Sequence, residues 1–254
     1  LGRSSLGEPY RAQSSQMQRE CLLTLVRPEL AQDEGFQKRL QDLSPSLQGL
    51  QHPNLTRVHH VGRELNHTYI AADLVEAGEG REQSLSDLLS DEGEILSEER
   101  TRDMALQIAH ALEHAHEAGI PHLGLSPSHI LLSRYGKVVV TGCGETLLLG
   151  PRLRQPSEYW SPEQTAGAEG NGASDVFALG LILYRMLTGE EIESSIDPPS
   201  SFGVSKRWDA IVEGCLNPNE AERFPSMSAL LESMNDMEEE EASGRTFKIM
   251  STVL

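Results

Sequence analysis

The chain changes character near residue 77, and this change limits its fold more than any other feature. Residues 1–76 hold short apolar stretches between turns, which is typical of strands, with one helical stretch from about residue 34. The polar segment AGEGREQ (77–83) follows as a linker, and helical patterns dominate after it. The sequence therefore predicts an α+β fold with a small antiparallel sheet and a larger, mainly helical part.

The clearest single element is a helix over residues 98–117. Ser97 can cap its first turn, an apolar stripe of alanine, isoleucine and leucine recurs at helical spacing, and Gly119 can end it. In the first part, ECLLTLVRP (20–28) is expected to be a strand that stops at Pro28. Pro45 should break or kink the helix that begins near residue 34.

The net charge restricts the class of partner, and the cysteine content indicates the redox compartment. The net charge of −18 disfavours nucleic acid and anionic lipid, because both would be repelled. The three cysteines, Cys21, Cys143 and Cys215, form no C-x-x-C pair, so a reducing compartment is expected. The apolar run 177–187 is too short to cross a bilayer. We expect a cytoplasmic segment of a longer protein, or the cytoplasmic part of a membrane-anchored one.

Several short motifs occur in one fixed order. They are LGRSSLG (1–7), LLTLVRPEL (22–30), QHPNL (51–55), GIPHLGLSPSHILLS (119–133), VVVTGCGE (138–145), YWSPEQ (159–164), SDVFALGLILYRMLTGEE (174–191) and NPNEAERFPSM (217–227). In this order they resemble a eukaryotic-type Ser/Thr protein kinase domain of the bacterial kind. The resemblance covers about residues 1–235.

The resemblance implies a bilobal fold. A five-stranded sheet with one helix would form the N-lobe (1–76), a helical C-lobe would span 77–235, and 236–254 would be an acidic linker or tail. Four residues would have structural roles: His122 would bond backbone near the D-F-G turn, Asp175 would accept backbone N–H groups of the catalytic loop, and Glu163 would pair with Arg223.

The residues that phosphoryl transfer requires are different here. The reaction needs cations on the phosphates, carboxylates on Mg²⁺ and a base for the hydroxyl. The resemblance places uncharged residues at these positions. The three positions of the glycine-rich loop are Gly2, Ser4 and Gly7. Thr24 stands at the position of the phosphate-binding lysine, and Leu43 stands at that of the helix glutamate, with Asp42 adjacent. The catalytic-loop and metal-binding positions hold Gly124, Ser126, His129 and Gly142.

The sequence therefore predicts a pseudokinase with weak or absent binding of ATP and Mg²⁺. Loss of a general base alone costs about 10²–10⁴ in rate, and the other losses compound it. Its role would be binding or allostery, with a protein partner such as an active kinase or neighbouring domains. The alternative is a divergent kinase or nucleotide transferase that uses Asp73, Glu76 or Glu145.

Other motifs suggest competing sites. His110, Glu113 and His114 form the H-x-x-E-H spacing of a zinc hydrolase, although a solvated helix face explains them as well. The pair His59-His60 suits strand packing better than a metal. Cys143 could be a reactive thiol or a buried small residue. The leucines at 147–149 could dock a partner, and packing on the domain is the simpler expectation.

Overall fold

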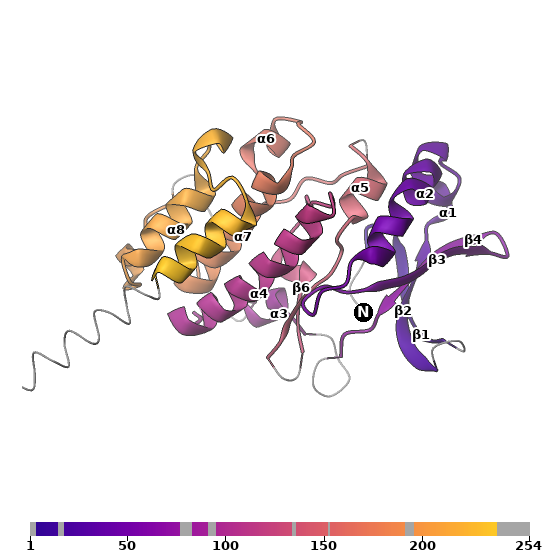
Figure 1. The fold of residues 1–254 in the computed structure, drawn as a ribbon, viewed down its shortest axis with the longest axis horizontal. Coiled ribbons are helices and arrows are strands. Elements are labelled where there is room, and N and C mark those ends of the chain that lie inside the picture. The colour runs from indigo at the N-terminus through magenta and orange to yellow at the C-terminus, as the bar shows by residue number, and fades with distance from the viewer. Residues whose placement is uncertain are drawn as a thin grey trace, which may run out of the picture.

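The computed structural model describes residues 4–14, 18–76, 83–90, 95–133, 136–151, 153–190 and 196–237. Figure 1 shows a twisted sheet with α2 beside it at one end of the molecule and a stack of helices at the other. The short strand β6 and helix α5 lie between these two groups. The described residues therefore have the expected α+β arrangement, with a sheet first and helices second along the chain.

Four antiparallel strands form the first sheet. They are β1 (Gly7–Ser14), β2 (Arg19–Val26), β3 (Val58–Glu64) and β4 (His67–Asp73), in the order β1-β2-β4-β3. The family resemblance implied five strands, and the described residues supply four. Pro9 lies on the edge strand β1, opposite Thr24 of β2. An edge position tolerates a proline because one side of the strand needs no ladder hydrogen bond.

Helices α1 (Pro28–Ala31) and α2 (Glu34–Gly49) follow the second strand. Asp33 caps α2 by accepting a hydrogen bond from the backbone N–H of Phe36 at 2.6 Å. Pro45 was expected to break or kink the helix, and a break does not occur, because α2 continues through Pro45 to Gly49. Leu47 and Leu50 beyond the proline are buried, at 3% and 4% exposure. Burial of these two leucines offsets the hydrogen bond that Pro45 cannot donate.

A second sheet links the two parts of the chain. It contains β5 (Gln83–Ser84), β6 (Ile130–Leu132) and β7 (Val138–Val140) in that order. The segment after α2 reaches this sheet, since Thr56 donates its backbone N–H to the carbonyl of Val140 at 2.9 Å and Val140 donates to the carbonyl of Asn54 at 2.8 Å. Helix α3 (Leu85–Leu88) follows β5 directly.

The helical part is built around two long helices. Helix α4 (Glu98–Glu117) is capped by Ser97, as expected, and α7 (Gly172–Thr188) is buried along almost its whole length. Around them are α5 (Glu145–Leu149), α6 (Pro162–Thr165), α8 (Arg207–Leu216), a helix over residues 227–237, and the short 3-10 helices η2 (Pro127–His129), η3 (Pro199–Phe202) and η4 (Glu220–Glu222). None of the helices in the described ranges is long and apolar enough to cross a membrane.

Candidate functional site

The loop between α4 and β6 is held by one buried aspartate. Asp175, in the first turn of α7, is 1% exposed. Its carboxylate accepts the backbone N–H groups of His122 and Leu123, both at 2.7 Å, and lies 2.8 Å from Nε2 of His116. The carboxylate therefore ties the start of the loop to α7 and to the end of α4.

Leu123 has an unusual backbone conformation at the centre of this loop. Its φ is 60°, in the left-handed region that side chains with a Cβ rarely occupy. Its N–H is bound by Asp175, and its carbonyl accepts a hydrogen bond from Nε2 of Gln164 at 3.0 Å. Conformations of this kind persist only where the surroundings fix them. The polar contacts on both sides of Leu123 supply that constraint.

The loop itself carries two imidazoles, those of His122 and His129. Nε2 of His122 lies 2.9 Å from the carbonyl of Thr141, and Nδ1 of His129 lies 2.9 Å from the hydroxyl of Ser126. The rings meet edge to face with 5.0 Å between centroids. Burial, with a smaller contribution from His122, lowers the pKa of His129 to about 3. His129 is therefore neutral at pH 7.

The neutral state of His129 predicts a pH-dependent stability. Its pKa is lowered in the folded protein, so its contribution is present above the unfolded pKa of about 6.5 and is lost as the pH falls below it. Between pH 7 and pH 5 this one group should cost about 2 kcal/mol of unfolding free energy. Urea unfolding of the wild type and of His129→Asn at both pH values measures it. An equal pH dependence in both proteins would contradict the assignment.

The amino-terminal loop lies against the start of α5. The hydroxyl of Ser5 donates to Oε2 of Glu145 at 2.9 Å, and the hydroxyl of Ser4 lies 3.3 Å from both carboxylate oxygens. Burial raises the pKa of Glu145, and the serine hydroxyls oppose that shift. Gly7 is required by packing, since a Cβ there would lie 1.8 Å from the carbonyl oxygen of Leu25. Gly2 lies outside the described residues.

Thr24 and Leu43 stand where the resemblance would place a lysine and a glutamate, and both are uncharged. Thr24 faces the cleft, and Leu43 faces the core. Thr24 on β2 is 9% exposed and lines a cavity beneath the sheet. Leu43 on α2 packs against the core, whereas the adjacent Asp42 is exposed. A shift of one residue therefore does not bring an acid to this face. Arg39 of α2 points elsewhere and donates to the carbonyl oxygens of Leu148 and Leu149 at the end of α5.

The cavity beneath the sheet measures about 140 Å³. Pockets that hold drug-sized ligands are typically about 300–1,000 Å³. Its charged lining residues are the carboxylates Asp73 and Glu145, and no lysine or arginine is among the described residues around it. The described lining therefore offers a phosphate no lysine or arginine. The full lining is Ser4, Pro9, Leu22, Thr24, Thr56, Asp73, Val75, Ser128, His129, Leu131, Thr141, Gly142 and Glu145.

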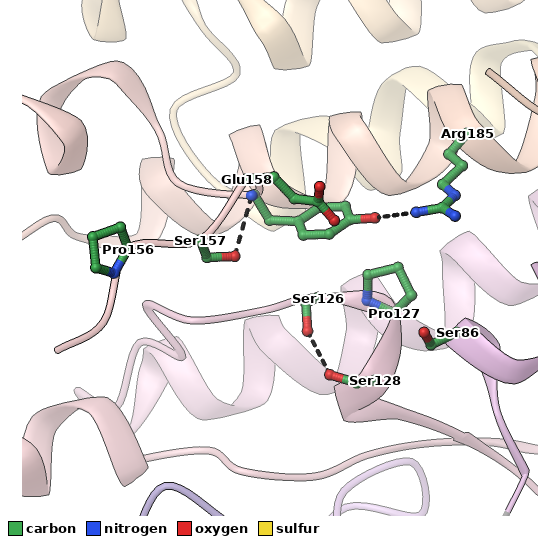
Figure 2. Close-up of a pocket in the computed structure, with 9 residues that line it drawn as sticks. Ser86, Ser126, Pro127, Ser128, Pro156, Ser157, Glu158 and Arg185 are labelled. Carbon is green, nitrogen blue, oxygen red and sulfur yellow. Dashed lines mark hydrogen bonds between the residues drawn. The ribbon is translucent and has the colours of Figure 1, made fainter. Parts of the chain in front are cut away.

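A more open hollow of about 340 Å³ lies on the other side of the loop. Figure 2 shows Ser126 and Pro127 of the loop facing the segment around Ser157, with the guanidinium of Arg185 directed toward the hydroxyl of a tyrosine, Tyr159, at 3.1 Å. Its walls are mostly hydroxyl-bearing and carry both signs of charge.

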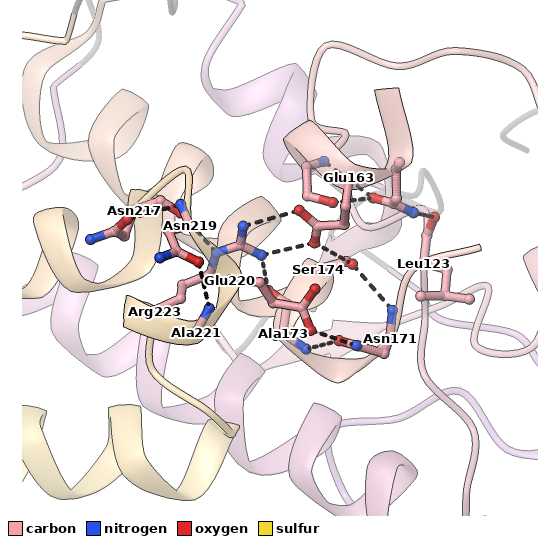
Figure 3. Close-up of polar contacts among 12 residues, drawn as sticks. Leu123, Glu163, Asn171, Ala173, Ser174, Asn217, Asn219, Glu220, Ala221 and Arg223 are labelled. Carbon is pink, nitrogen blue, oxygen red and sulfur yellow. Dashed lines mark hydrogen bonds and ion pairs between the residues drawn. The ribbon is translucent and has the colours of Figure 1, made fainter. Parts of the chain in front are cut away.

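The pair Glu163–Arg223 joins α6 to the residue that follows η4 (Figure 3). The guanidinium of Arg223 donates from Nη1 and Nη2 to the two carboxylate oxygens at 2.9 and 3.0 Å. It also donates to the carbonyl oxygens of Ala173 and Asn217, at 2.9 and 3.1 Å. The ion pair that the resemblance implied is thus formed, with the arginine almost fully buried.

The proposed zinc ligands do not converge. His110 is exposed, Glu113 is hydrogen-bonded to Ser228, and His114 stacks on His52 with 5.5 Å between ring centroids. Throughout the described ranges, no group of three or more histidine, cysteine or acidic side chains is placed to hold a metal ion. The helix spacing alone therefore gives the zinc hypothesis no structural support.

Two of the three alternative acids have cationic or imidazole partners away from the loop. Asp73 lies 2.7 Å from Nε2 of His59, and Glu76 lies 2.7 Å from the guanidinium of Arg11. His60 packs near Tyr69. Asp73 and Glu145 both line the cavity beneath the sheet, but of the three acids it is Glu145 that directly follows the Gly142 turn, where its backbone N–H donates to the carbonyl oxygen of Gly142 at 3.0 Å.

The remaining candidates are packed. Burial raises the pKa of the Cys143 thiol, with Asp175 and Glu145 adding to the effect, so a reactive thiolate is disfavoured. Leu148 and Leu149 are 1% and 6% exposed, and Leu147 packs against the same core. The expectation that these leucines pack on the domain is confirmed.

Sequence reasoning missed several residues that fix the site. Gln164, His116 and Arg39 each form a long-range contact described above. Gln164 ends the motif YWSPEQ but was given no role, and His116 and Arg39 lie outside the motifs. The capping pattern of Ser161 with Gln164 gave a local signal for Gln164, although its bond to Leu123 depends on the fold. Arg39 gave no signal, because a single arginine on an amphipathic helix is ordinarily solvated.

Comparisons with known proteins agree with this architecture. The family model described as "Protein kinase domain" matches residues 1–235. A probable serine/threonine-protein kinase of Streptomyces coelicolor is 31% identical over 201 residues, covering 74% of this chain and 29% of that protein. Serine/threonine-protein kinase PrkC of Bacillus subtilis is 29% identical over 196 residues, with the same two coverages of 74% and 29%.

A solved structure matches as well. The crystal structure of the PknI kinase domain of Mycobacterium tuberculosis superposes with a TM-score of 0.74 and 25% identity, covering 93% of this chain and 92% of that one. The chain spans about three tenths of the length of the two curated relatives named above.

Proposed function

The chain belongs to the protein kinase domain family, and we propose that it is a member without phosphotransfer activity, a pseudokinase that acts as a protein-binding or allosteric module. The relatives' names describe Ser/Thr kinases, so the proposal rests on this chain's own residues. Its partner would be an active kinase or a neighbouring domain of a longer chain.

The observation that carries the proposal is the loss of charge around the loop. Thr24, Gly124, Ser126, His129 and Gly142 supply neither a carboxylate nor an ammonium group. Phosphoryl transfer depends on positioned positive charge and metal-binding acids, because the protein does little covalent chemistry. The cavity beneath the sheet adds two carboxylates and no cation. Binding of a triphosphate and transfer of its γ-phosphoryl group are both disfavoured by this arrangement.

Packing also supports the proposal, because the space for two acids is taken. A Cβ on Gly142 would lie 2.9 Å from Cδ2 of His129, and a Cβ on Gly124 would lie 2.9 Å from the hydroxyl of Thr146. Contacts below 3.0 Å require a neighbour to move. An aspartate at Gly142 therefore requires His129 to move, and one at Gly124 requires Thr146 to move.

This packing gives a coupled prediction. Gly142→Asp should destabilise the fold by about 1–3 kcal/mol, and His129→Asn should recover part of that loss when the two are combined. A urea double-mutant cycle measures the coupling. Gly119→Asp is the matched control, since Gly119 has a similar positive φ of 73° but no neighbour within 4 Å of its Cβ. Equal costs at both glycines, with no coupling to His129, would contradict the crowding.

Nucleotide binding tests the proposal directly. A ligand that binds only the folded protein raises the melting temperature. We expect no shift with millimolar ATP, with or without Mg²⁺ or Mn²⁺. A metal-dependent shift would count against the proposal. In that case Glu145, which lies at the cleft and is bonded by Ser4 and Ser5, would be the first substitute ligand to test.

A further inference from the structure

Residues 50–57, the junction segment, lead from α2 to β3 and connect the sheet-bearing part of the chain to the helical part. Asn54 in this segment is buried, and its side-chain amide donates to the carbonyl of Val138 at 2.7 Å and to Oε1 of Gln107 on α4 at 2.8 Å. Backbone hydrogen bonds from Val140 to Asn54 and from Thr56 to Val140 continue the connection to β7. The position of the junction segment therefore sets how the two parts of the chain are joined.

A histidine begins the turn that presents Asn54. The backbone N–H of Asn54 donates to Nδ1 of His52 at 3.2 Å, and the backbone N–H of Leu55 donates to the carbonyl of His52 at 3.1 Å. An imidazole nitrogen that accepts a hydrogen bond carries no proton, so His52 is neutral in this arrangement. A proton on Nδ1 would set two donors against each other and break the bond from Asn54.

The ring of His52 lies on a second imidazole, that of His114 on α4. The two centroids are 5.5 Å apart and the ring planes are inclined by 28°, so the rings are stacked. The stack holds the start of the junction segment against α4. Two positive rings at this distance would repel each other, and a proton on one ring makes a proton on the other less favourable.

The cationic groups near the stack act in the same direction. Burial lowers the pKa of His52, and His114, His110 and Lys137 lower it further, in that order. His110 lies one turn before His114 on α4, whereas Lys137 directly precedes β7. Groups from two separate elements therefore oppose a proton on His52.

The acids on this part of α4 do not counter the effect. Glu113 lies 3.7 Å from Nδ1 of His110 and accepts a hydrogen bond from Ser228, so its carboxylate already has partners. Glu117, near the end of α4, is exposed to solvent. Neither carboxylate shifts the pKa of His52. The neutral form of His52 is thus favoured while the junction segment is in place.

We propose that His52 is a proton-sensitive latch: protonation of its Nδ1 breaks the bond from Asn54 and charges the stack on His114, so that the junction segment opens from α4 as the pH falls from 7 to 5. The closed latch binds fewer protons than the open one. Its contribution is therefore present above the ordinary histidine pKa of about 6.5 and is lost as the pH falls below that value. This inference goes beyond the proposed function, since it concerns the joint between the two parts of the chain and not phosphate chemistry.

Hydrogen exchange of the 254-residue chain at pH 7 and pH 5, corrected for the intrinsic pH dependence of exchange, tests the latch. The amides of Asn54, Thr56 and Val140 should lose protection by at least about threefold at pH 5. The limit is about 25-fold, for one histidine that titrates at about 6.5 in the open state and stays neutral in the closed one. Protection that does not change would overturn the proposal.

The variant His52→Asn separates the latch from other groups that titrate in this range. The side-chain oxygen of asparagine can accept the N–H two residues later, as Nδ1 of His52 does, and it does not titrate. The loss of protection at the three amides should therefore be at least about threefold smaller than in the wild type. His67→Asn, at an exposed position of β4, is the matched control and should keep the wild-type loss. A wild-type response in His52→Asn would overturn the assignment to His52.

An NMR titration of the imidazole protons gives a second readout that needs no stable variant of His52. In the wild type His52 should titrate below about 6.5, and in His114→Gln its midpoint should rise toward that value. A wild-type midpoint at or above 6.5, or one that His114→Gln leaves in place, would overturn the proposal. These outcomes are separable from the proposed function, because phosphotransfer or a metal-dependent ATP shift would refute that function and leave the titration of His52 unchanged.

Discussion

Replacing Arg223 by Met is expected to lower the free energy of unfolding by about 3–5 kcal/mol. The guanidinium is buried and donates to Glu163 twice, to Ala173 and to Asn217, and it lies 5.0 Å from the ring centre of Phe177. Removing it leaves a partly buried carboxylate and two carbonyl oxygens without their donor. Such a loss is much larger than that of an exposed ion pair, which contributes about 0–1 kcal/mol.

Urea denaturation measures this cost, with Arg100→Met as the matched control on an exposed position of α4. The double variant Glu163→Gln/Arg223→Met should lose less than the sum of the single variants, because the carboxylate that Arg223→Met strands is then uncharged. A loss below 1 kcal/mol for Arg223→Met would contradict a structural role for the pair.

The same pair sets an acid limit on stability. Burial raises the pKa of Glu163, but hydrogen bonds from Arg223, Ser161, its own backbone and Ser174 outweigh burial and lower the pKa to about 2. A lowered carboxyl pKa contributes stability that is present above the unfolded value of about 4.3 and is lost as the pH falls through the folded value. The wild type should therefore lose stability between about pH 4 and pH 2 more steeply than the double variant.

Asp175→Asn is expected to cost about 2–4 kcal/mol, although it changes few atoms. Both carboxylate oxygens accept backbone N–H groups, one from His122 and one from Leu123, and an amide can accept only one of them. The other N–H would face an NH₂ group and remain unpaired in a buried site. Leu123 would also lose one of the two contacts that hold its left-handed backbone.

Hydrogen exchange gives this prediction a local readout. The amides of His122 and Leu123 should exchange faster in Asp175→Asn, and urea unfolding should show the loss of stability. Asp42→Asn, on the exposed face of α2, is the matched control and should change neither measurement. Unchanged protection of the two amides would mean that Asp175 does not hold the loop.

The sequence was sufficient for the parts of the fold that local patterns determine. The stripe and cap of α4, the strand that ends before Pro28 and the pair Glu163–Arg223 follow from periodicity and from motif order. The expected break at Pro45 does not occur, because burial of Leu47 and Leu50 keeps α2 helical beyond the proline. The local preference of proline is outweighed here by tertiary packing. Propensity is a weak guide where packing decides.

The site could be predicted only in part. Motif order located the loop, whereas the assignment of uncharged residues to its catalytic positions stays a prediction. The contacts of Ser4 and Ser5 with Glu145 join residues 140 or more positions apart, and no local pattern encodes them. The stack of His52 on His114 depends equally on the folded arrangement. Such long-range contacts are set by the topology of the two sheets and not by any short stretch.

A phosphotransfer assay tests the central claim most directly. The domain is incubated with labelled ATP and Mg²⁺ or Mn²⁺, alone and with a basic protein as acceptor, and incorporation of phosphate or AMP is measured by mass spectrometry. The account predicts incorporation no greater than in a heat-denatured control. Metal-dependent incorporation that Glu145→Gln abolishes would contradict it and identify a divergent enzyme.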